Sequence, residues 1–168
     1  MKRILVVALE IILFFLLETT IFQWIPFIKV TPNLLLILTV SMGFMRGHIS
    51  GLVVGFFSGL LLDMYFGTYM GICALIYVLI GYASGFANKI FVKEELSIPV
   101  ILIGVGELGY FFLYYILEFL LRGRLNIGYY FLTIGIPRII YTVVVGIILY
   151  KLIYKINMKL DIRKDEEV

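Results

Sequence analysis

Long apolar runs, separated by short stretches of polar residues, glycine and proline, occupy most of this chain. Six such segments lie at residues 4–24, 31–45, 48–66, 70–88, 96–121 and 131–155. The length of several segments is close to the ~20 apolar residues that a helix needs to cross a bilayer. The second is the weakest, because its most apolar part, Leu34–Val40, is short. It is expected either to tilt or to enter and leave on one side. The pattern predicts an all-α integral membrane protein with about six transmembrane helices.

The composition supports a location in the membrane. Of the 168 residues, 62% are hydrophobic and 15% are charged, whereas a soluble domain carries about 25% charged residues. Lys2 and Arg3 precede the first apolar run as in a signal peptide, but no small-residue cleavage site follows, so this run is expected to remain as the first helix. We expect a single polytopic membrane domain, residues 1–155, and a short charged cytoplasmic tail, residues 156–168.

Lysine and arginine residues predict the orientation, because the cytoplasmic loops of membrane proteins carry an excess of them. With the N-terminus inside, ten fall on the cytoplasmic side: Lys2, Arg3, Arg46, Lys89, Lys93, Lys151, Lys155, Lys159, Arg163 and Lys164. The other four are Lys29, Arg122 and Arg124 on the external side and Arg138 just inside the last helix. Both termini are therefore expected to be cytoplasmic.

Ionisable residues at membrane depth are rare and are usually paired or functional. The predicted topology places four of them in the outer half of the bilayer at similar depth, namely Glu18, Asp63, Glu118 and Arg138. Glu10 and Glu107 are expected deeper, toward the cytoplasmic half. These charges could lock the helices together, bind a polar ligand or a partner helix, or take part in proton-coupled chemistry.

Glycine recurs at every fourth position from Gly43 through Gly47, Gly51 and Gly55 to Gly59. At about 100° per residue the last three span only about 80° of the helix surface, so they form one continuous stripe. Such small-residue stripes let helix backbones approach closely in membranes. Gly43 and Gly47 are expected in the turn before this helix. The sequence leaves open whether the stripe contacts a helix of this chain or a helix of a partner.

Signs of catalysis are weak. The chain has one cysteine, Cys73, and one histidine, His48, so neither a cysteine-built metal site nor an internal disulfide is possible. Ser58 and Ser84 could suggest an intramembrane serine protease, but His48 is predicted at the membrane edge. No phosphate-binding loop or metal-ligand spacing is present, and the basic tail is too short to bind nucleic acid. We expect no enzymatic activity, no cofactor and no metal.

Three stretches of the sequence together resemble the MreD family of bacterial rod shape-determining membrane proteins. They are "TPNLLLIL", "GLVVGFFSGLLLDMYFGTYMG" and "ALIYVLIGYASG". Within them the resemblance is carried by Pro32-Asn33 and by the glycine–aspartate block. From the glycine spacing and this resemblance together, the residues expected in helix packing or partner binding are Gly51, Gly55, Gly59, Asp63, Gly71, Gly81 and Gly85.

The resemblance implies a non-enzymatic role in the bacterial cytoplasmic membrane. MreD-like proteins act with the bitopic protein MreC and, indirectly, with MreB-like filaments, a RodA-type glycosyltransferase and a class B penicillin-binding protein in lateral peptidoglycan synthesis. Membrane lipid is a further expected partner, and nucleic acid is not. The family fold is similar to the substrate-binding subunits of energy-coupling-factor transporters. The alternative function is therefore a small-molecule (vitamin-type) binding subunit of a transporter.

Overall fold

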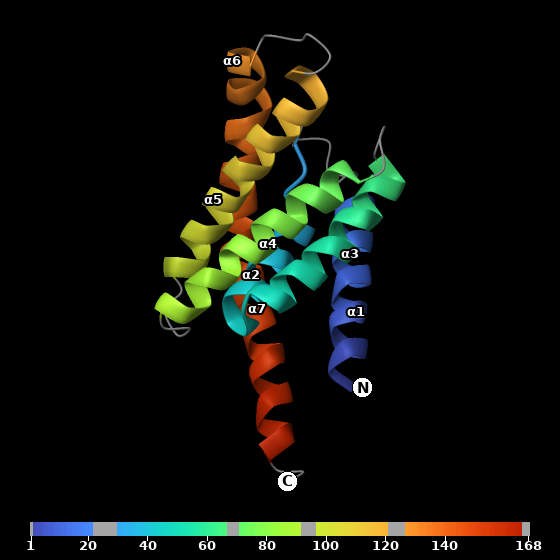
Figure 1. The fold of residues 1–168 in the computed structure, drawn as a ribbon, viewed down its shortest axis with the longest axis vertical. Coiled ribbons are helices and arrows are strands. Elements are labelled where there is room, and N and C mark those ends of the chain that lie inside the picture. The colour runs from blue at the N-terminus through green and yellow to red at the C-terminus, as the bar shows by residue number, and fades with distance from the viewer. Residues whose placement is uncertain (1, 22–29, 67–70, 92–96, 121–126, 166–168) are drawn as a thin grey trace.

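The computed structural model describes residues 2–21, 30–66, 71–91, 97–120 and 127–165, and all regular structure in these ranges is helical (Figure 1). The helices are α1 (Lys2–Leu16), α2 (Leu34–Arg46), α3 (His48–Phe66), α4 (Ile72–Ile90), α5 (Ser97–Tyr114), α6 (Ile127–Tyr130) and α7 (Ile136–Asp165). Wider π-helical turns continue three of them, at Leu17–Ile21 after α1, Tyr115–Leu120 after α5 and Phe131–Gly135 between α6 and α7.

Four helical stretches of the described residues are long and apolar enough to cross a membrane: His48–Phe66, Ile72–Ile90, Ser97–Leu117 and Gly128–Lys159. With the shorter α1 and α2 they make six helical rods, because α6 and α7 form one rod through the π-helical turn. The predicted all-α membrane fold is confirmed. The two termini lie at the same end of the bundle (Figure 1), as an even number of crossings requires.

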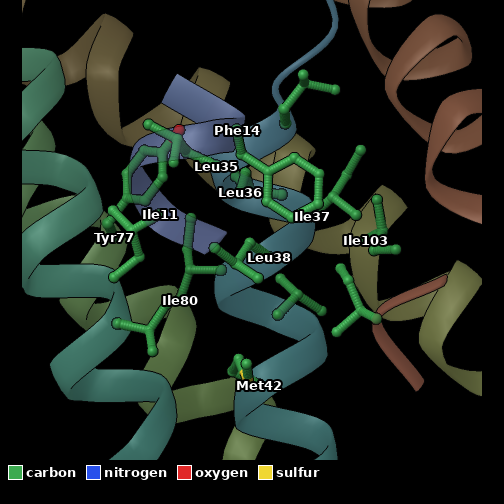
Figure 2. Packing of buried hydrophobic residues seen from close by; sticks show 14 of the residues in the cluster. Ile11, Phe14, Leu35, Leu36, Ile37, Leu38, Met42, Tyr77, Ile80 and Ile103 are labelled. Carbon is green, nitrogen blue, oxygen red and sulfur yellow. The ribbon is translucent and has the colours of Figure 1, made fainter. Parts of the chain in front are cut away.

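The central element is α2, the segment whose membrane crossing was the least certain from the sequence. Every residue from Leu34 to Met45 is buried, and α1, α3, α4, α5 and α7 all contact this helix. Figure 2 shows Leu36, Leu38 and Met42 of α2 in a cluster with Tyr77 of α4 and Ile103 of α5. A helix that is apolar all round is one buried on all sides. With 13 residues, α2 is shorter than the four candidate membrane spans, and other helices cover it.

The glycine stripe of α3 packs against α4 of the same chain. A Cβ atom added to Gly59 would lie 2.6 Å from the carbonyl oxygen of Cys73, and one added to Gly55 would collide with the carbonyl of Tyr77. Gly51 and Gly81 face each other so closely that a Cβ on either would overlap the other's carbonyl group. No side chain fits between these backbones, so the two helices make the most extensive contact in the bundle.

Gly43 and Gly47 were both predicted in the turn between α2 and α3, and only one of them lies there. Gly47 ends α2 with a φ of +95°, a backbone conformation that favours glycine, so its predicted place in the turn is confirmed. Gly43 instead lies inside α2, where an added Cβ would be 2.7 Å from the carbonyl oxygen of Gly81. The prediction for Gly43 is wrong because this glycine lies three residues before the end of α2 and lets the helix approach α4.

The ends of the last helix also differ from those predicted. Helical structure begins at Ile127 rather than residue 131, and α7 continues to Asp165 instead of stopping near residue 155. Residues 156–165 contain neither glycine nor proline, so nothing in them interrupts a helix. The end of α7 projects beyond the other helices (Figure 1).

Candidate functional site

Asn33, the residue before α2, is the centre of a buried polar cluster. Its side-chain oxygen accepts a hydrogen bond from the backbone N–H of Leu36 at 3.2 Å, which caps the helix. The same oxygen accepts the hydroxyl proton of Tyr77 from α4. Its backbone N–H donates to the hydroxyl oxygen of Thr142 on α7 at 3.1 Å. One asparagine therefore begins α2 and joins it to two other helices.

The amide nitrogen of Asn33 extends the cluster to an ion pair. It donates to a carboxylate oxygen of Glu107 on α5 at 3.1 Å, and the other oxygen of Glu107 lies 2.8 Å from Nε of Arg138 on α7. The guanidinium of Arg138 also stands 4.9 Å from the ring centre of Tyr110, in cation–π contact. The side chain of Glu107 is 1% exposed and that of Arg138 is 25% exposed. The carboxylate is thus enclosed, while the cation reaches the edge of the bundle.

Glu18 approaches the same region from the π-helical turn that follows α1. It is 5% exposed, and one carboxylate oxygen accepts the backbone N–H of Leu35 at 3.2 Å. The first N–H groups of a helix have no partner within the helix and carry the positive end of its dipole. Glu18 therefore supplies both a hydrogen-bond acceptor and a negative charge to the start of α2.

Asp63 does the same for α4. Its two carboxylate oxygens accept the backbone N–H groups of Gly71 at 3.0 Å, Cys73 at 2.9 Å and Ala74 at 2.9 Å. Gly71 precedes α4 with a φ of +107° and offers no side chain to cap the helix. The aspartate at the end of α3 thus provides the cap that the glycine lacks. This explains chemically why an aspartate follows the glycine stripe.

The predicted grouping of charges is therefore only partly found. Arg138 pairs with Glu107, which the sequence placed deeper in the membrane, and the acceptor oxygens of Asp63 are used by backbone N–H groups of α4. The physical reason is that helix starts inside the bundle compete with the arginine for carboxylates. Glu10 is 5% exposed, and neither of its oxygens has a hydrogen-bond partner among the described residues. The side chain of Glu118 lies outside the described residues.

Most of the residues weighed for catalysis have packing or hydrogen-bond contacts in the structure, whereas the hydroxyl of Ser58 is buried without a hydrogen-bond partner among the described residues. His48 lies at the start of α3, with its ring stacked on Phe86 at 6.1 Å and its backbone against Gly85. Ser84 donates to the carbonyl of Gly81 within its own helix. Cys73 is buried and free. Within the described ranges no group of three or more histidine, cysteine, aspartate or glutamate side chains could hold a metal ion.

Sequence reasoning missed three members of the polar cluster: Asn33 as its centre, Tyr77 and Thr142. The signal for Asn33 was present, because it stands with Pro32 directly before an apolar run, where an asparagine commonly caps a helix. The second segment was expected to begin at residue 31, but the helix begins at Leu34. Tyr77 and Thr142 gave no local signal, since their roles depend on which helices become neighbours.

The buried central helix, the apolar helices around it and the enclosed polar cluster define a polytopic α-helical membrane protein. The family model described as "rod shape-determining protein MreD" matches residues 1–160. The chain therefore belongs to the MreD family of bacterial rod shape-determining membrane proteins, and the resemblance found in the sequence is confirmed. No curated protein and no solved structure matches the chain. The similarity to transporter subunits thus stays a prediction.

Proposed function

We propose that this protein is a non-enzymatic component of the bacterial cell-elongation complex. In this role it binds an MreC-like bitopic membrane protein and, through it, helps MreB-like filaments, a RodA-type glycosyltransferase and a class B penicillin-binding protein to direct lateral peptidoglycan synthesis. The observation that carries the proposal is the match of the family model to residues 1–160. We also propose that the protein lies in the cytoplasmic membrane with both termini cytoplasmic, which the distribution of lysine and arginine supports.

The polar cluster around Asn33 acts, in this proposal, as a lock that holds the helices in one arrangement. Its members come from α2, α4, α5 and α7, and their hydrogen bonds join these helices to one another. Polar groups that are bonded to each other inside a membrane protein resist helix separation, because separation would leave them unpartnered in lipid. A scaffold needs such a fixed shape in order to present a constant surface to its partners.

The partner-binding surface is proposed on the outer sides of α3 and α4. Their glycine faces are already used against each other, so neither is available to a second protein. Their opposite sides carry large exposed apolar residues, among them Phe56 on α3 and Phe86 on α4, which are 44% and 49% exposed. Exposed apolar residues of this size are suited to contact either lipid or the helix of a partner.

Cross-linking in cells tests this assignment. Cysteines introduced at Phe56 and Phe86, in a Cys73→Ser background, are expected to cross-link to a single-span protein of the MreC type. A cysteine at Val144 on α7, which is 52% exposed, is the matched control and should give less of that product. Depletion of the protein should also make rod-shaped cells round. Normal cell shape after depletion, together with loss of uptake of a vitamin, would contradict the proposal and favour the transporter alternative.

A further inference from the structure

A groove of about 520 Å³ lies between α1 and α3, with Met42 and Arg46 of α2 contributing to its lining. Its walls are almost wholly apolar, and they include Ala8 of α1 and Val53 and Phe57 of α3. Ala8 is exposed, as are Val53 at 44% and Phe57 at 52%. The two helices run side by side in Figure 1. The groove therefore opens to the surroundings of the bundle and is distinct from the polar cluster around Asn33.

Among the side chains that the structure describes, Arg46 is the one charged group that lines this groove. It is the last residue of α2, next to the turn at Gly47, and this turn lies toward the end of the bundle that carries both termini (Figure 1). Nη2 of Arg46 is buried and has no hydrogen-bond partner in the described part of the chain. An apolar groove thus contains, at the end of α2, a cation whose donors are not fully used by the described residues.

From this arrangement we infer that the groove binds one anionic phospholipid, with an acyl chain between α1 and α3 and the phosphate on Arg46. A guanidinium pairs strongly with phosphate oxygens, and basic pockets between transmembrane helices bind anionic lipid headgroups. The volume lies within the range of about 300–1,000 Å³ that is usual for small-ligand sites. The inference is independent of the proposed function.

Glu10 provides a second test of the inference, in which the expected change in lipid binding has the opposite sign. Its buried carboxylate on α1 has no hydrogen-bond partner among the described residues, and the positive charge of Arg46 acts on it. If Arg46 only offset this buried charge, lipid binding would not depend on either residue. In the lipid site, Glu10 instead competes with the phosphate for the arginine. Its neutralisation should therefore strengthen lipid binding, whereas loss of Arg46 should weaken it.

The experiment is a lipid titration of the full-length protein, freed of bound lipid in detergent and followed by native mass spectrometry. The probes are dioleoyl phosphatidylglycerol, which is anionic, and dioleoyl phosphatidylcholine, which is zwitterionic. The wild type should retain one phosphatidylglycerol in preference to phosphatidylcholine. Arg46→Gln should weaken this retention by about tenfold, since a charge-assisted bond is lost. Glu10→Gln should strengthen it.

Matched variants separate the groove from general effects. Ala8→Phe should fill the groove and abolish retention, whereas Val144→Phe, at an exposed position on α7, should bind as the wild type does. Lys151→Gln, at an exposed lysine of α7, controls for a change of charge. The inference would be overturned if Arg46→Gln and Ala8→Phe retained as much phosphatidylglycerol as the control variants. An Ala8→Phe variant that keeps its lipid but loses a single-span partner would also overturn it, because the groove would then be a protein-docking site.

Discussion

Glu107 and Arg138 form an ion pair, and the protein should lose more stability when the arginine is replaced than when the glutamate is replaced. Arg138→Gln leaves a carboxylate that is 1% exposed without its cation, and removal of one partner of a buried pair costs about 3–5 kcal/mol. Glu107→Gln leaves an arginine that is 25% exposed and retains an acceptor for Asn33. Its cost is about 1–3 kcal/mol, because the group that loses its partner is only partly buried.

The single cysteine makes this difference measurable without a further label. Cys73 is 6% exposed, so a thiol-reactive fluorogenic dye should react with it only when the bundle opens on heating. In a chain of this size each kcal/mol lowers Tm by about 2–4 °C. Arg138→Gln should therefore unfold at least a few degrees below Glu107→Gln, with Arg138→Lys in between, because the lysine keeps the charge but loses the planar contact with Tyr110.

A double-mutant cycle decides whether the pair itself is responsible. The variant that carries both Glu107→Gln and Arg138→Gln no longer has an unpaired buried charge, so its Tm should lie close to that of Glu107→Gln alone. Non-additivity of this kind is the signature of residues in direct contact. Additive losses in the double variant, or an Arg138→Gln variant as stable as Glu107→Gln, would refute the reasoning.

Two further substitutions test the helix start at α4 and the glycine contact. Asp63→Ala should expose Cys73 to the dye below the temperature of global unfolding, at a local cost of about 2 kcal/mol, since the buried N–H groups of α4 lose their acceptor; Asp63→Asn, which keeps one oxygen, should restore part of the protection. Gly59→Ala should destabilise the protein by about 1–3 kcal/mol, because its Cβ would be 2.6 Å from a carbonyl oxygen. Gly109→Ala, where nothing lies within 4 Å, should be neutral or stabilising, and equal effects of the two alanines would contradict the packing argument.

Local patterns in the sequence predict the helices and the glycine face well. The third helix has the predicted limits, His48–Phe66, because glycine and polar residues interrupt the apolar pattern at both ends. The spacing of Gly51, Gly55 and Gly59 identifies a close contact from one helix alone. The spacing does not indicate that α4 is the helix in contact with this face. This contact becomes evident only when Gly81 is found opposite Gly51.

Charge pairing was harder to predict, because depth in the membrane does not determine which side chains meet. The sequence placed Glu18, Asp63, Glu118 and Arg138 at similar depth, where they could lock the helices together. The pairing of Arg138 with Glu107 depends instead on the contact between α5 and α7. The burial of α2 on all sides also follows from the arrangement of five other helices around it. Periodicity within a single segment contains no information on such neighbours.

The helix starts inside the bundle explain two of the membrane-embedded carboxylates. Unpaired N–H groups are costly at membrane depth, and Glu18 and Asp63 each accept N–H groups at the beginning of a helix. Glu107 is bonded to Asn33 and paired with Arg138. A small molecule that bound to these carboxylates would have to displace bonds that hold helices together. Partner contacts of this protein are therefore better sought on the exposed apolar faces of its helices than in its polar interior.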